Sequence, residues 1–126
     1  MNSTFTKVLT IVFGLGLLFF GLSKFISFSF MPVPNLPEDA ANFMASLSAT
    51  GYILPLVGIL EIAIGLFLIV NRWVPFALFL LAPISINILL FHLCLDLPGL
   101  IAALIVVIIN AILIYKHWKA YRPLFN

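Results

Sequence analysis

Long runs of Leu, Ile, Val and Phe, separated by a few polar residues, divide the chain into four apolar stretches. Each stretch is close to the ~20 residues that a helix needs to cross a hydrocarbon core of about 30 Å. Lipid offers no hydrogen-bond partner to an exposed backbone, so we expect each stretch to be a helix that satisfies its own N–H and C=O groups. The predicted spans are Thr4–Phe28, Tyr52–Val70, Val74–Leu95 and Pro98–Tyr115.

The segment between the first two spans, residues 31–50, has a different pattern. Its prolines favour an extended start, and from Pro37 the pattern predicts a short helix that ends before Gly51. One face of this helix is apolar and consists of Ala40, Phe43, Met44 and Leu47. The helix is too short to span, so we expect it to lie in the membrane interface, either as a structural cover or as a gate over a pocket.

The composition supports a membrane protein. Of the 126 residues, 64% are apolar and 8% are charged, whereas soluble domains have about 25% charged residues. We therefore predict one domain over residues 1–126, an all-α transmembrane four-helix bundle with a short interfacial amphipathic helix. The first span should be retained, because Lys24 and bulky residues follow it where a signal peptide would have small ones.

The distribution of charge predicts an orientation. Lys and Arg outside the spans collect on one side, which should be cytoplasmic and carry both termini: Lys7, Arg72, Lys116, Lys119 and Arg122. The opposite connections, expected in the periplasm, carry Glu38, Asp39 and Asp96. Trp73, Trp118 and Tyr121 fit an aromatic belt on the inner side. The protein is thus expected in a bacterial inner membrane, and its net charge of +2 is too small for nucleic-acid binding.

Polar groups within the spans gather in the outer half. An ionisable group in hydrocarbon costs about 2.5–3.5 kcal/mol, so each one requires a partner or a function. At ~1.5 Å per residue, Glu61 and Asn87 lie ~13 Å from the outer end, and Lys24 and His92 about 6 Å. The candidate residues for ligand binding or proton handling are Lys24, Glu61, Ser85, Asn87, His92 and Asp96.

The third predicted span cannot present all its polar groups on one face. At ~100° per residue, Ser85 and His92 share a face, and Asp96 lies about 40° further round. Asn87 points nearly opposite Asp96 and should bond a different neighbour.

Glu61 is the strongest single candidate. Gly58 and Gly65 flank it, and their missing side chains should let another helix approach closely. Two roles are open: a buried structural bond to Lys24 or Asn87, or ligand binding and proton handling.

His92 and Asp96, four residues apart, are too few ligands for a metal site, so none is predicted. Asp96 is instead expected to accept from one ring nitrogen and leave the other facing a cavity. Cys94 should be a small buried apolar residue, and Asn110 should form a hydrogen bond between helices.

No nucleophile with a base, phosphate-binding loop or carboxylate pair can be assembled, so no catalytic residue is assigned. Gly14 and Gly16 lie inside an apolar span and are best explained by helix packing.

Several stretches together resemble one known family. They are "GLGLLFFGLSKF" and "LPLVGILEIAIGLFLIVNRWVPFALFLLAPISINILLFH", with "PISINILLFHLCLD" as the most distinctive part. With the spacing of Lys24, Glu61 and His92, nearly the whole chain resembles the DoxX-like family of small bacterial four-helix membrane proteins. The resemblance implies that fold, and relatives are tied to quinone-linked sulfur oxidation or to thiol and oxidative-stress systems. Relatives in thiol chemistry often carry cysteine pairs, whereas this chain has only Cys94.

The first functional hypothesis is a periplasm-facing pocket in the membrane that binds a small hydrophobic or quinone-like molecule, or a lipid. Lys24 would hold the Glu61 carboxylate, while Glu61 and His92 exchange protons, in support of redox or respiratory chemistry. If the chain belongs to an enzyme, it would be a quinone-linked oxidoreductase component. The alternative is a non-catalytic accessory subunit of a larger membrane complex, with membrane lipids or a homo-oligomer as further partners. A transporter ranks third, because no inverted repeat is visible.

Overall fold

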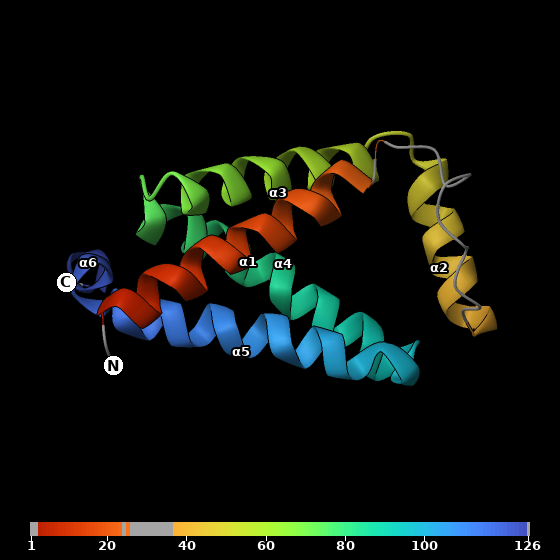
Figure 1. The fold of residues 1–126 in the computed structure, drawn as a ribbon. Coiled ribbons are helices and arrows are strands. Elements are labelled where there is room, and N and C mark those ends of the chain that lie inside the picture. Colours follow the sequence, from red (N-terminus) through yellow and green to blue (C-terminus); the bar gives the residue numbers. More distant parts are fainter. Residues whose placement is uncertain (1–2, 24, 26–36, 126) are drawn as a thin grey trace.

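The described part of the chain consists of helices and short connections. The computed structural model describes residues 3–23, 25 and 37–125. Its elements are α1 Ser3–Ser23, α2 Glu38–Ala49, α3 Ile53–Ile69, α4 Val74–Cys94, α5 Leu100–Lys116 and α6 Trp118–Tyr121, with 3-10 turns at Leu97–Gly99 and Arg122–Phe125 (Figure 1). The predicted all-α fold, with a short helix between the first two spans, is confirmed.

The chain is a multi-pass membrane protein by helix length and hydropathy. Within the described residues, three segments are long and apolar enough to cross a membrane: Thr4–Ser23, Val74–Cys94 and Leu97–Lys116. A fourth candidate is the pair of α2 and α3, which bends by 89° between its two helices. The predicted ends of the second and third spans agree with α3 and α4 to within one residue. Residues 24 and 26–28, the predicted end of the first span, lie outside the described residues.

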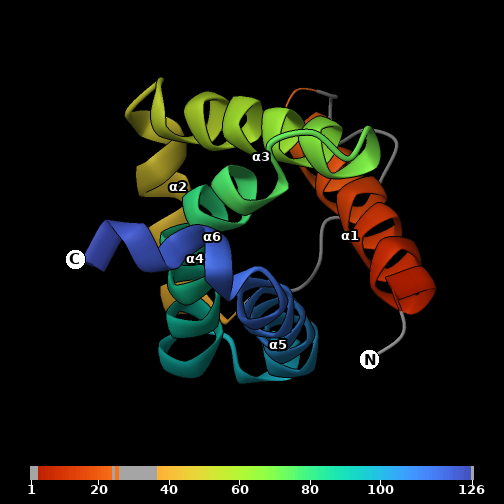
Figure 2. The same cartoon turned by 90° about the vertical axis from the view of Figure 1, so that its left-hand side faces the viewer.

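The helices pack as two hairpins. α1 lies along α3, and α4 lies along α5 (Figure 1). The hairpins meet near the short connection between α3 and α4, and they diverge toward the opposite end, where α2 projects from the start of α3 (Figure 1). An end view shows α1 and α3 on one side of the molecule and α4 with α5 on the other (Figure 2).

The charged side chains separate along the bundle. One end, called the basic end below, carries Lys7, Arg72, Lys116, Lys119 and Arg122. The other, called the acidic end, carries Glu38, Asp39 and Asp96. The structure therefore groups the charges as the orientation argument requires, while the compartment that each end faces stays a prediction.

Glycines hold α1 and α3 together by letting the two backbones approach. A Cβ atom added to Gly14 would lie 2.8 Å from the carbonyl oxygen of Gly65, and one added to Gly65 would lie 2.7 Å from that of Gly14. A Cβ added to Gly21 would lie 2.8 Å from the carbonyl oxygen of Gly58. Contacts this short leave no room for a side chain, so the helices can keep this distance only with glycine. The expected close approach of a helix to Gly58 and Gly65 is confirmed.

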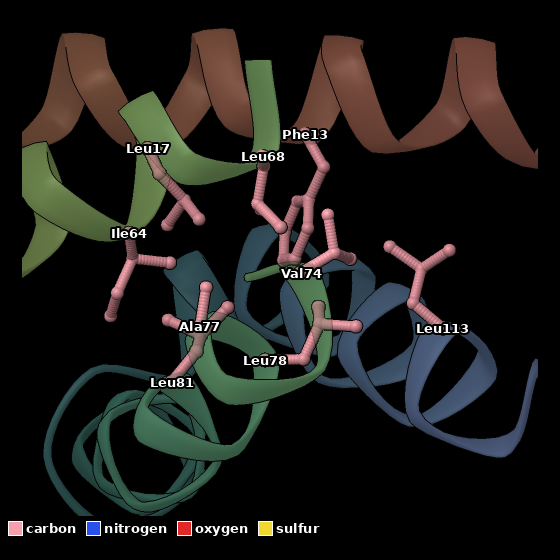
Figure 3. Packing of buried hydrophobic residues seen from close by; sticks show 9 residues of the cluster. All are labelled: Phe13, Leu17, Ile64, Leu68, Val74, Ala77, Leu78, Leu81 and Leu113. Carbon is pink, nitrogen blue, oxygen red and sulfur yellow. The ribbon is translucent and has the colours of Figure 1, made fainter. Parts of the chain in front are cut away.

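Apolar side chains fill the space where the hairpins meet (Figure 3). This core consists of Phe13, Leu17, Ile64, Leu68, Val74, Ala77, Leu78, Leu81 and Leu113. Its members from α3, α4 and α5 come from the half of each helix nearer the basic end. Dense packing in lipid rests on van der Waals contact, so the hairpins are joined most firmly there. The polar residues of the predicted site lie toward the other end.

The corner between α2 and α3 is built by Thr50 and Gly51. The Thr50 hydroxyl donates to the carbonyl of Leu47 at 2.6 Å and accepts from the N–H of Ile53 at 3.2 Å. One side chain thus bonds both the end of α2 and the first N–H of α3. Gly51 has a φ of +78°, which glycine adopts without strain, so the predicted stop after α2 is confirmed.

Tyr121 attaches the C-terminal helices to the start of α4. Its side chain is buried, and its hydroxyl donates to the carbonyl of Pro75 at 2.5 Å. Burial raises the pKa of Tyr121 to about 12, so the phenol stays neutral and keeps donating at physiological pH. The prediction that Tyr121 belongs to an aromatic belt is therefore wrong, because the backbone of α4 takes up its polar end. Trp73 and Trp118 are exposed, as a belt requires.

Replacing Gly65 with alanine should destabilise the protein, because the new Cβ would press against the backbone of α1. We expect a loss of about 1–3 kcal/mol in the free energy of unfolding, measured by equilibrium unfolding in mixed detergent micelles. Gly16→Ala is the matched control, since a Cβ there meets nothing within 4 Å and alanine favours a helix. Equal stability of the two variants would contradict the close approach of α1 and α3.

Candidate functional site

Glu61 lies in the middle of the inward face of α3. At ~100° per residue, the buried residues of this helix fall within an arc of about 120°, and they are Gly58, Glu61, Ile64, Gly65 and Leu68. Glu61 is 2% exposed, and its Oε1 atom is fully enclosed. Since an ionisable group costs about 2.5–3.5 kcal/mol in a span, its position at the centre of this face requires compensating contacts or a function.

The glycines around Glu61 explain how it becomes enclosed. Gly58 precedes it by three residues and Gly65 follows by four, so all three project from nearly the same side of α3. Both glycines lie at the contact with α1, whose backbone therefore passes beside the turn that carries the carboxyl group. Glu61 lies about 12 Å along α3 from its acidic end.

His92 and Asp96 form the predicted pair at the end of α4. His92 Nδ1 lies 3.1 Å from Asp96 Oδ2 and 3.2 Å from the backbone oxygen of Asp96. Both oxygens are acceptors, so Nδ1 carries the proton and Nε2 is an acceptor in the neutral ring. The predicted contact of Asp96 with one ring nitrogen is confirmed, and that the other nitrogen faces a cavity stays a prediction. The side chains are 20% and 9% exposed, which places the pair at the edge of the bundle.

Gly99 packs against the imidazole of His92, a contact that the sequence argument missed. A Cβ on Gly99 would lie 2.5 Å from His92 Nδ1 and 2.9 Å from Asp96 Oδ2. The glycine therefore allows the turn at Leu97–Gly99 to fold directly over the pair. The run "LPGL" after Asp96 was the available signal, because Pro-Gly marks a tight turn.

Two phenylalanines connect α2 to the histidine. The rings of Phe43 on α2 and Phe91 on α4 have centroids 5.7 Å apart, and Phe91 meets His92 edge-on at 5.0 Å. α2 therefore touches the helix that carries His92 at the position next to it. This contact fits both open roles of α2, as a cover and as a gate.

Ser85 joins α4 to α5 instead of facing His92. Its hydroxyl lies 3.0 Å from Asn110 Oδ1 and 2.9 Å from the carbonyl of Ala82, and it is 2% exposed. Asn110 in turn donates to the carbonyl of Leu78 at 3.2 Å. The prediction that Asn110 bonds between helices is confirmed, and Ser85 is its partner.

The remaining candidates are placed apart from this pair. Asn87 is exposed, and its amide donates to the carbonyl of Pro83 in its own helix at 2.8 Å. Cys94 is exposed, so the prediction of a buried residue is wrong, because α4 ends at Cys94 and presents this position outward. Lys24 lies outside the described residues. Within the described ranges, no three His, Cys, Asp or Glu side chains lie together as a metal site would require.

The comparisons with known proteins do not assign this chain to a family. No protein-family model matches it, and no significant match exists among curated proteins or solved structures. The resemblance to the DoxX-like family therefore stays a prediction. The class that fold and site define is a helical multi-pass membrane protein with a buried carboxyl group and an oriented histidine.

Gly99→Ala should separate His92 from Asp96, because the new Cβ would overlap the ring. We expect the ¹⁵N chemical shifts of His92 to change from an Nδ1-protonated ring to a mixture of tautomers, measured by NMR on histidine-labelled protein. Gly16→Ala serves as the control and should leave these shifts unchanged. An unaltered His92 spectrum in Gly99→Ala would show that the turn does not hold the ring.

Proposed function

We propose that the chain binds a small hydrophobic, quinone-like molecule in the membrane, between the two hairpins and toward the acidic end. The observation that carries this proposal is the burial of Glu61 at the centre of the inward face of α3. The ring contact between Phe43 of α2 and Phe91 of α4, next to His92, supports it. A ligand of this kind is apolar over most of its surface and polar at its carbonyl oxygens. The side chains of the proposed site are likewise mostly apolar, with Glu61 and His92 as its polar positions.

The chemistry of the two polar positions suits such a ligand. Reduction of a quinone takes up two electrons, which an electron-transfer partner of the chain would supply, and two protons, which come from acid–base side chains or from water. A carboxyl group within the bundle and a histidine at its edge are acid–base side chains on different helices. Asp96 fixes the tautomer of His92, so Nε2 is the ring atom available to a ligand or to water. In this proposal His92 exchanges protons with the periplasm, and Glu61 holds the polar end of the ligand.

The proposed orientation in the membrane follows from the distribution of Lys, Arg, Asp and Glu. Lys and Arg of cytoplasmic loops mark the inner side of a membrane, so the basic end would face the cytoplasm and the acidic end the periplasm. The chain would then be a DoxX-like inner-membrane protein that supports redox or respiratory chemistry.

The accessory-subunit hypothesis stays as the alternative. The exposed side chains of α1 and α5 are largely apolar, for example Val12 and Ile101. Lipid covers such faces as well as a partner protein does, so the exposed surface favours neither hypothesis.

A quinone-like ligand should accompany the protein through purification. The protein would be purified in mild detergent, extracted with organic solvent and analysed by mass spectrometry against detergent and lipid blanks. We expect one lipophile near stoichiometric amount in the wild type and its loss in Glu61→Gln, because the amide can neither carry charge nor exchange a proton.

Glu38→Gln is the matched control, since Glu38 is exposed on α2 and should keep the ligand. Unfolding temperatures of all three proteins distinguish loss of ligand from loss of fold. Recovery of bulk phospholipid alone from the wild type, or equal recovery of the lipophile from Glu61→Gln, would overturn the proposal.

A further inference from the structure

The cations of the basic end have no acidic side chain beside them. The whole sequence contains four Asp and Glu residues, which are Glu38, Asp39, Glu61 and Asp96. Three lie at the acidic end, and Glu61 lies within the span. The basic end carries five Lys and Arg residues, which are Lys7, Arg72, Lys116, Lys119 and Arg122. No Asp or Glu side chain is therefore placed to balance their charge, and the basic end attracts anions.

Part of this charge surrounds a hollow between α1 and the end of α5. The hollow has a volume of about 340 Å³ and is lined by Thr6, Lys7, Thr10, Asn71, Lys116 and His117. A second, larger hollow of about 680 Å³ shares Lys116 and His117 with it, and Lys119 and Arg122 also line this second hollow. Lys116 thus lines both hollows, and Arg72 lines neither.

The walls of the hollows are held by hydrogen bonds. His117 Nδ1 donates to the carbonyl of Leu113 at 2.9 Å, which fixes the ring at the end of α5. Tyr121 ties α6 to Pro75, so the turn that carries Lys119 and Arg122 is anchored to α4. The cations therefore project from backbone with a fixed position, and binding an anion does not require this backbone to become ordered.

The surroundings are those of a membrane interface. Tyr115 is 77% exposed beside the larger hollow, and Trp118 stacks on Phe125 with ring centroids 5.9 Å apart. Exposed aromatic rings next to Lys and Arg are typical of segments at the level of lipid headgroups. Apolar side chains such as Val8 on α1 continue from this level into the hydrocarbon region.

We infer that these hollows bind the headgroup of an anionic phospholipid, with its phosphate between Lys7 and Lys116. Basic pockets between transmembrane helices suit such headgroups, and each Lys or Arg near them contributes about 1 kcal/mol, which corresponds to about fivefold in affinity. The acyl chains would extend along the exposed apolar sides of α1 and α5. This site lies at the basic end, whereas Glu61 lies near the middle of α3, and the inference does not depend on the proposed function.

The test compares two lipids with the same acyl chains, anionic phosphatidylglycerol and zwitterionic phosphatidylcholine. Each is titrated into the full-length protein in mild detergent, and the unfolding temperature is followed by tryptophan fluorescence. We expect phosphatidylglycerol to stabilise the protein at lower concentration than phosphatidylcholine, because a ligand that binds the folded state raises its stability.

Lys116→Gln should raise the phosphatidylglycerol concentration for half-stabilisation by about fivefold, whereas Lys116→Arg should restore it. Arg72→Gln removes the same charge from the same end but lines neither hollow, so it should leave the concentration nearly unchanged. An equal rise of this concentration in Lys116→Gln and Arg72→Gln would overturn the site and indicate a general attraction between the basic surface and anionic lipid.

Inorganic phosphate tests whether the site binds the phosphate of a lipid headgroup or free phosphate. It is added at the same ionic strength as a chloride control, and we expect no stabilisation beyond that of chloride. Stabilisation equal to that by phosphatidylglycerol would overturn the lipid assignment and indicate a site for free phosphate. Equal effects of phosphatidylglycerol and phosphatidylcholine would overturn selectivity for anionic lipid.

Discussion

The close contact between the backbones of α1 and α3 is the constraint on which the remaining structure depends. Two glycine pairs, Gly14 with Gly65 and Gly21 with Gly58, are seven residues apart on each helix and run in opposite directions. They bring the helices together without side chains between them, so α3 turns its remaining buried arc toward α4. Glu61 lies in the middle of that arc. A wider separation of α1 and α3 would loosen the enclosure of this carboxyl group and the apolar core below it.

The two ends of the bundle differ in what holds them. Near the basic end, an apolar core and a short connection join the hairpins, and the bond from Tyr121 to Pro75 attaches α6 to α4. Toward the acidic end the hairpins diverge, and the contacts are aromatic and polar, as between Phe43 and Phe91 (Figure 1). A tightly packed end suits a fixed site for a headgroup. The distribution of packing thus keeps the two proposed sites separate.

Much of the fold could be predicted because lipid permits few alternatives. Apolar length located the spans, and the glycines beside Glu61 indicated a close helix. The site was harder, because periodicity tells which residues share a face of one helix and not which helix they meet. Ser85 shares a face with His92 yet bonds Asn110 on α5. Cys94 is exposed because α4 ends there, and periodicity alone does not show where the last turn of a helix lies.

Solid-state NMR on protein labelled with ¹³C only at glycine, in lipid bilayers, tests the central contact most directly. The chain has seven glycines, so few pairs can give signals. Close packing of α1 and α3 predicts cross-peaks between Gly14 and Gly65 and between Gly21 and Gly58, which are far apart in sequence. Resolved signals from these four residues without either cross-peak, while the local pair Gly14 and Gly16 remains visible, would contradict the contact and the enclosure of Glu61 that follows from it.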